Sequence, residues 1–204
     1  MMHRKTRRAL SLTIVLSVLV SCGALRVSAQ ESPAPVSPDP AACTIEPRSL
    51  PSIAALWDGK PVPDSLPARA EVTIPIGSEL DAVTRAAVTT TIHGIFACLN
   101  GPDMGRAFAY LTDDALVSNF GWAVQAIAQG ESWVMNTRDQ MPPEMRMTIL
   151  ALGPIMRLPD GRVGALVTFH DPNSDPETKI AALYLVLSLQ GPIWQIDEVY
   201  PIQE

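Results

Sequence analysis

The sequence predicts an α+β fold in which helices come first and one antiparallel sheet follows. Helix caps and apolar residues at helical spacing lie between residues 78 and 129, and apolar residues alternate at strand spacing after Pro143. Turn residues divide the second half into consecutive strands, a pattern typical of an antiparallel meander with helices on one face. The 19 prolines exclude a helical bundle over the full length, because proline breaks helix interiors.

The first long helix is expected to begin at a capping box, in which Ser78 is the N-cap and Asp81 replaces the usual Glu. It should run to about Asn100, where Gly101 and Pro102 end it. The residues expected on its buried stripe are Val88, Ile92, Ile95, Phe96 and Leu99.

Shorter helices are expected next. Asp103 is the expected N-cap of a helix over 104–111. Thr112, with the two aspartates that follow it, caps another helix that ends near Phe120, and a further helix or irregular stretch covers 122–129.

Four strands are expected after Pro143. The first begins near Met145 and is interrupted by a bulge at Gly153–Pro154. The others cover 163–169, 180–189 and 193–199. A separate edge strand is expected at 72–76, where Pro75 could not donate to a central ladder.

The N-terminus is typical of an export signal. Basic residues up to Arg8 precede an apolar run from Ala9 to Val20, and small residues follow. This run is shorter than the roughly 20 residues that a spanning helix needs. Removing the signal takes away basic residues and no acidic ones, because Glu31 is the first acid. The acidic remainder argues against nucleic acid and anionic lipid as partners.

Two cleavage positions fit this signal. Cys22 follows a Leu-x-small triplet and resembles a lipobox cysteine, which becomes acylated, whereas Ala29 ends an ordinary signal-peptidase motif. We favour the lipobox, which would make an acyl chain the membrane attachment. The expected organisation is a signal over 1–29 (ending before Cys22 in the lipoprotein reading), a Pro/Ala/Ser-rich tether over 30–42, an extension over 43–77 and an α+β domain over 78–204.

Two cysteines, Cys43 and Cys98, remain after export. An even number in an exported chain favours a disulfide over two separate buried thiols. Such a bond would pin the Pro-rich N-terminal segment to the first long helix.

The stretch from Ala87 to Leu116 resembles the opening of nuclear transport factor 2-like proteins, which include the SnoaL-like and ketosteroid-isomerase-like families. The turn at 100–103, the step at 112–114 and the closing strand at 191–198 carry the resemblance, which covers about residues 80–200. It implies a cone, in which a curved antiparallel sheet wraps around helices and leaves a pocket at the wide end. Such folds include isomerases, dehydratases, cyclases and binding domains, so fold does not decide function. The acid or base of the catalytic members has no match here, and no catalytic residue is assigned.

Polar candidates for chemistry are few. His93 lies beside the apolar stripe, where a partly exposed histidine is expected. His170 begins an acidic loop that lacks the glycine and terminal glutamate of a calcium loop. Asp113 and Asp114 are adjacent and are expected to cap a helix rather than act as a facing pair. Zinc spacing and phosphate-binding glycine motifs do not occur, so we expect no metal or cofactor.

Side-chain alternation assigns faces to the last two strands. The leucines between Ile180 and Leu189 are assigned to the helix side, and the opposite face is still apolar. We expect either the extension over 43–77 or a second copy of the chain, in a sheet-to-sheet homodimer, to cover that face. In the last strand, Asp197 and Glu198 are expected on opposite faces.

These features predict an exported, lipid-anchored, non-catalytic domain that binds a small apolar ligand or a protein partner. The alternatives are an isomerase or dehydratase of the ketosteroid-isomerase-like group and a structural interaction module on the cell surface. A titratable group facing a pocket would favour the enzyme, and a filled cone would favour the interaction module. The residues expected to contact a ligand are Phe96, Tyr110, Phe120, Trp122, Trp133, Leu185 and Trp194.

Overall fold

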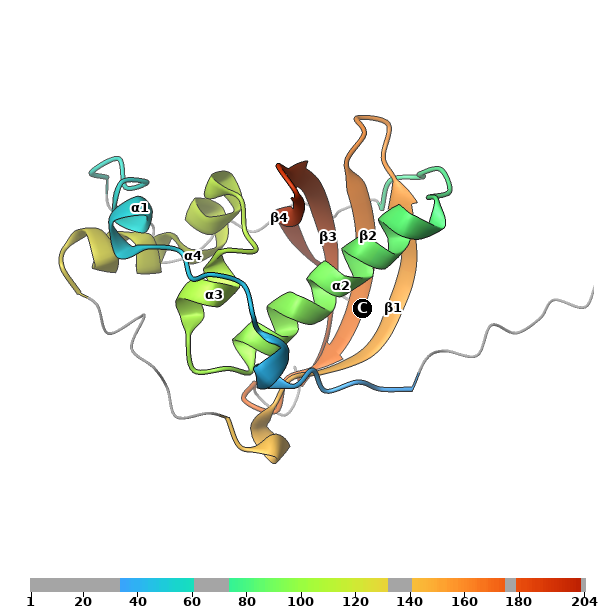
Figure 1. Cartoon of the computed structure of the whole chain (residues 1–204), viewed down its shortest axis with the longest axis horizontal. Helices are drawn as coiled ribbons and strands as arrows, with labels where there is room; N and C mark the ends of the chain where they lie inside the picture. The colour runs from blue at the N-terminus through green and yellow to red at the C-terminus, as the bar shows by residue number, and fades with distance from the viewer. Residues whose placement is uncertain (1–33, 61–73, 132–140, 175–178, 203–204) are drawn as a thin grey trace, which may run out of the picture. The chain divides into compact units, whose positions relative to one another are not determined.

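The computed structural model describes residues 34–60, 74–131, 141–174 and 179–202. Within these residues the helices precede a four-stranded sheet, which confirms the predicted α+β class. The helices lie on one side of the sheet, and the longest helix crosses it (Figure 1). Cys22 and Trp133 lie outside the described residues. The edge strand expected at 72–76 is not confirmed: its first two residues also lie outside the described residues, and residues 74–76 form no strand.

The sheet is an antiparallel meander in the order β1-β2-β3-β4, as predicted. Its strands are β1 (Thr148–Arg157), β2 (Val163–His170), β3 (Ile180–Gln190) and β4 (Ile193–Ile202). Gly161 in the turn after β1 has a φ of 89°, and Gly191 in the turn after β3 has a φ of 59°. Glycine adopts these left-handed conformations without steric cost, which explains why the turns fall there.

The edge of β1 is interrupted along its length. Register shifts occur between Ile149 and Ala151 and between Leu152 and Ile155, which confirms the bulge expected at Gly153–Pro154. Short antiparallel pairings occupy both ends of this edge, and they join Val36 to Ile149 and Ser78 to Arg157. The strand begins at 148, later than expected, because a short 3-10 turn, η3 (Pro143–Met145), comes first.

The opposite edge, on β4, is interrupted as well. The Ile196 amide donates to the Tyr110 carbonyl at 2.8 Å, and the Ile196 carbonyl accepts from the Thr112 amide at 2.9 Å. Pro201, further along β4, has no amide to donate. Both edges of the sheet are therefore poorly suited to adding another strand.

The N-cap of the longest described helix, α2 (Ala82–Leu99), is Asp81 and not Ser78. The Asp81 carboxylate accepts a hydrogen bond from the Thr84 amide at 2.8 Å. Ser78 exchanges backbone hydrogen bonds with Arg157 of β1, so it is held in an extended pairing and cannot cap a helix. The predicted capping box was wrong. Both Ser78 and Asp81 are good N-cap residues, but the Ser78 backbone pairs with β1, so Asp81 caps the helix.

The predicted buried stripe of α2 is confirmed. Val88, Ile92, Ile95 and Phe96 are buried in the main core, between the helices and the sheet, and Leu99 is half-buried against it. By length and composition alone, this helix could also cross a membrane, as many buried core helices could.

Two further helices have the predicted caps. Asp103 caps α3 (Met104–Phe108), and Thr112 caps α4 (Asp113–Ala128) by accepting from the Ala115 amide at 3.2 Å. The helix expected to end near Phe120 and the stretch after it form one helix, which is kinked where Phe120 has non-helical backbone angles.

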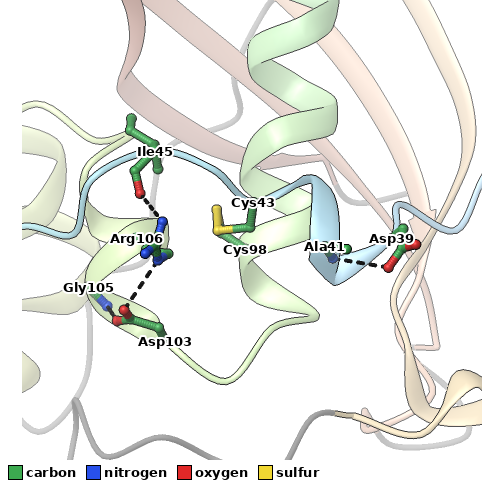
Figure 2. Close-up of a disulfide and its surroundings, with 8 residues drawn as sticks. All are labelled: Asp39, Ala41, Cys43, Ile45, Cys98, Asp103, Gly105 and Arg106. Atoms are coloured by element: carbon green, nitrogen blue, oxygen red, sulfur yellow. Dashed lines mark hydrogen bonds and ion pairs between the residues drawn. A yellow bond between two sulfur atoms is a disulfide. The ribbon is translucent and has the colours of Figure 1, made fainter.

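The C-terminal end of α2 holds the segment that precedes the domain. Cys98 is disulfide-bonded to Cys43, which confirms the predicted pairing (Figure 2). Asn100 is fully buried and donates to the carbonyls of Pro38 at 3.2 Å and Met147 at 3.0 Å. The Met147 amide donates back to the Asn100 side chain at 2.7 Å. One side chain thus joins α2, the N-terminal segment and the approach to β1.

The N-terminal segment is docked from Val36 onwards, although composition predicts a tether over 30–42. Pro38 is buried, and η1 (Pro40–Ala42), whose Pro40 is also buried, packs on α2. Proline in this segment fits an extended chain against a surface, because its fixed φ reduces the entropy lost on docking.

Residues 44–54 run along α3 and α4. Arg106 of α3 donates to the Ile45 carbonyl at 2.6 Å and is paired with Asp103 (Figure 2). Arg48 forms an ion pair with Asp113 at the start of α4. This stretch contains a short helix, α1 (Leu50–Ala54), whose Ile53 is fully buried.

Removing the disulfide should lower the free energy of unfolding by about 4 kcal/mol, because the bond closes a loop with a sequence separation of 55. Urea unfolding, followed by tryptophan fluorescence, of the Cys43→Ala/Cys98→Ala protein measures this change. Wild-type protein unfolded with a thiol reductant should show the same loss. Unchanged midpoints in both experiments would contradict the prediction.

Candidate functional site

The residues expected to contact a ligand do not share one surface. Phe96 and Leu185 are buried in the main core, where the Phe96 ring packs edge-on against Phe169 with centroids 5.2 Å apart. Phe120 packs against Phe108, also at 5.2 Å. Trp122 is 47% exposed on α4, and Trp133 lies outside the described residues.

Two of these residues are half-buried beside the core. Tyr110 lies against α2 at Gly94, where a Cβ atom would overlap the phenol. Burial raises the pKa of the Tyr110 phenol, so the hydroxyl stays neutral. Trp194 is paired across the sheet with Leu189 and packs on the main core.

Turn capping accounts for the described part of the acidic loop, residues 171–174, and the two described histidines lie at the surface. His93 and His170 are partly exposed. The Asp171 carboxylate accepts from the Asn173 amide and the Ser174 hydroxyl, both at 2.9 Å, so it caps its own turn. Among the described residues, no cluster of His, Cys, Asp and Glu has the arrangement of a metal site.

Among the described residues, Arg162, in the turn after β1, forms the most ion pairs. Its guanidinium forms ion pairs with Asp160 at 2.8 Å, with Asp197 at 2.6 Å and with Glu198. The Tyr200 hydroxyl donates to the other Glu198 oxygen. We call Arg162, Asp160, Asp197 and Glu198 the Arg162 clamp. It ties the β1–β2 turn to β4, two strands away.

A bulge in β4 brings the two carboxylates together. Val186 pairs with Glu198, but Leu187 pairs with Ile196, so Asp197 is the additional residue. The predicted opposite facing of Asp197 and Glu198 was therefore wrong, because strict alternation fails at a bulge. Because of the same register shift, Glu198 pairs with Val186 of the outer face, whereas Ile196 pairs with Leu187 and is buried in the main core.

The clamp also reaches the helices. The Thr112 hydroxyl, at the N-cap of α4, donates to Asp197 at 3.1 Å. Hydrogen bonds to Glu198 and Asp197 raise the pKa of the Arg162 guanidinium, despite partial burial. Hydrogen bonds from the backbone and side chain of Arg162 lower the pKa of Asp160. The clamp therefore holds one cation against three anions.

The face of the sheet away from the helices has its own small core. Tyr184 and Val186 of β3 are buried there with Leu158, and Tyr200 and Ile202 pack against them. As predicted, Leu183, Leu185 and Leu187 belong to the main core on the helix side, whereas Leu189 extends beyond it and is exposed.

Tyr184 is the unusual member of this second core. It is 1% exposed, and its hydroxyl has no hydrogen-bond partner. Its ring lies over Gly164, where any Cβ atom would overlap the hydroxyl. Burial, with a smaller contribution from the charge of Asp160, raises the pKa of this phenol.

Beside this core the face is partly exposed across three strands and carries apolar side chains, with Thr168 opposite Ala182 and His170 opposite Ile180. Register pairs Leu166 with Tyr184 and Tyr184 with Tyr200, and it places Ala182 beside Ile202. Ile180, at the start of β3, is 65% exposed. We call the following residues the outer patch: Leu166, Ile180, Ala182, Tyr200 and Ile202.

Two hollows open on the helical side. One, of about 200 Å³, lies between α1 and the end of α4, and apolar atoms of Leu50, Pro51, Ala54 and Ile127 line most of it. The other, of about 220 Å³, lies beside the disulfide, with Pro102 and Arg106 at its wall. Both are smaller than the roughly 300 Å³ at which ligand sites usually begin.

No model of a known protein family matches this chain, and no curated protein or solved structure does so. Function is therefore inferred from the geometry alone.

Changing Tyr184 to Phe should raise the free energy of unfolding by about 1 kcal/mol, because it removes a buried hydroxyl that has no partner. Tyr200→Phe is the matched control, since it removes a hydroxyl bonded to Glu198 and should lower stability by about as much. Denaturant unfolding of both variants measures the difference. A loss of stability in Tyr184→Phe would mean that the hydroxyl has a favourable contact.

Proposed function

We propose that this chain is an exported, lipid-anchored, non-catalytic domain of nuclear transport factor 2-like architecture that binds a protein partner through the outer patch. The disulfide supports export, because such bonds persist in oxidising compartments. The order of helices and meander, with α2 against the sheet, supports the cone. Anchoring through Cys22 follows from the lipobox-like signal.

The outer patch is the observation that carries the binding function. An open sheet face normally turns polar towards water, yet Leu166, Ala182 and Ile202 lie together on this one, with Ile180 largely exposed beside them. A contiguous exposed apolar surface with a charged border is typical of a protein-binding site. The Arg162 clamp supplies that border here.

Binding by the face fits this sheet better than binding by an edge. Bulges and the pairings at Val36 and Ser78 interrupt β1, while Ile196 and Pro201 limit β4. A partner strand would find few consecutive free amides and carbonyls on either side. The face offers side chains, and sheets that pack face to face bury them at a spacing of about 10 Å.

A protein partner is favoured over a small apolar ligand by the positions of the aromatic side chains. Phe96 and Phe120 each pack against another ring, and Leu185 is part of the core. Of the two hollows bordered by described residues, the one between α1 and α4 is lined mostly by apolar atoms, and it offers about 200 Å³.

Site-specific photo-crosslinking tests the proposal. A benzophenone amino acid at Ala182, in cells that produce the full chain, should give a discrete protein adduct. The same group at Val83, which is 80% exposed on α2, should give little, because Val83 lies outside the outer patch. Equal crosslinking at both positions, or none at Ala182, would contradict binding through this face.

A further inference from the structure

We propose that the Asn100–Gly101 peptide is a latent modification site, at which the Asn100 side chain deamidates once residues 36–43 leave the end of α2. Among the asparagines of the chain, only Asn100 precedes a glycine. This pair is the one in which deamidation is fastest, because glycine has no side chain to hinder attack by its own backbone nitrogen. The site is separate from the outer patch, so it is tested independently of the proposed function.

The reaction needs only the chain itself and water. The Gly101 nitrogen loses its proton and bonds to the side-chain carbonyl carbon of Asn100. The bond from that carbon to the amide nitrogen breaks, and ammonia leaves. Water then opens the cyclic imide at either carbonyl, which leaves aspartate or isoaspartate in place of Asn100. No electrons are transferred, and the net change is the replacement of an amide by a carboxylate.

In the folded chain the attacking nitrogen is held away from its target. The Gly101 amide donates to the Cys98 carbonyl at 3.0 Å, so its proton is engaged. The Asn100 backbone is helical, with a φ of −78° and a ψ of −11°. This ψ turns the Gly101 nitrogen away from the Asn100 side chain, whereas ring closure needs the two on the same side. Asn100 must therefore leave its helical conformation before it can react.

The side-chain carbonyl of Asn100 is held as well. The Asn100 amide donates to the Pro38 carbonyl at 3.2 Å and to the Met147 carbonyl at 3.0 Å, and its oxygen accepts from the Met147 amide at 2.7 Å. Asn100 is fully buried, and Gly101 is buried beside it, so the water that must open the imide is excluded. The contacts that block the reaction are thus the ones that dock the N-terminal segment.

The disulfide determines how often these contacts open. Pro38 supplies one of the two acceptor carbonyls, and Cys43 ties the same segment to Cys98 of α2. Without that bond, the segment would be held mainly by the pairing of Val36 with Ile149 and by its buried prolines. Such a segment undocks by local opening, at a lower free energy than global unfolding requires.

Deamidation would prevent the segment from docking again. A carboxylate has no proton to donate, so its oxygens would face the carbonyls of Pro38 and Met147, and buried acceptors that face acceptors are unfavourable. Isoaspartate would also add a backbone atom at the end of α2 and displace Gly101. A reversible opening would thereby become a permanent change.

Peptide mass spectrometry of aged protein tests the site. The full chain, with Cys22→Ala so that Cys43 and Cys98 are its only cysteines, is kept in mildly alkaline buffer, either folded or in guanidinium chloride. Deamidation of Asn100 should be at least about tenfold faster in the unfolded chain. Gly101→Ala should slow the unfolded-state reaction by about as much. An Asn100 that stays intact in guanidinium chloride, or that reacts equally fast in the folded chain, would overturn the inference.

Two variants test the role of the docked segment. Folded Cys43→Ala/Cys98→Ala protein should deamidate at Asn100 at least about tenfold faster than the oxidised parent. Pro38→Gly keeps the disulfide but loosens the segment, and it should accelerate the reaction about fivefold. Pro35→Gly makes the same change at an exposed position outside the contact and should leave the rate unchanged.

Hydrogen exchange of the β3 amides separates local opening from loss of the whole fold. Slow exchange in β3 identifies a variant whose sheet is intact, and the deamidation rates are compared only among such variants. If the disulfide-free protein does not fold, the comparison of Pro38→Gly with Pro35→Gly decides. Parental rates of deamidation in every variant with a protected β3 would overturn the role of the docked segment.

Discussion

The C-terminal end of α2 is the constraint on which the rest of the structure depends. Cys98 and Asn100 lie within one turn there, and together they hold Cys43, Pro38 and Met147. An amide side chain that is fully buried must have its donors and acceptors satisfied, so the N-terminal segment and the start of β1 can dock only in this arrangement. Residues 36–43 are thereby part of the folded domain, and the prolines among them fit this docked conformation.

The two faces of the sheet are covered to different extents. The helix side is filled by α2 and α4, whereas the other side has a small core around Tyr184 and the partly exposed outer patch. The bulge at Asp197 aims two carboxylates at Arg162, so the border of the patch carries paired charges. This combination of a partly exposed apolar surface and an ion-paired border supports the proposed binding role.

Much of the fold could be predicted from local patterns. The meander, its glycine turns, the caps at Asp103 and Thr112 and the disulfide all depend on short-range preferences or on simple pairing. Two errors came from long-range effects. Pairing with β1 removed Ser78 from the cap of α2, and the bulge reversed the side-chain alternation that would have separated Asp197 from Glu198. The Arg162 clamp was missed for the same reason, because its members come together only through the register of β4.

Native-state hydrogen exchange at the end of α2 is the most direct test of this account. The Val36 amide donates to Ile149, and the Met147 amide donates to Asn100. If the contacts of Cys98 and Asn100 make residues 36–43 part of the fold, both amides should exchange as slowly as those of the central strand β3, through global unfolding. Exchange of both amides at the rate of an open loop, while β3 stays protected, would contradict it.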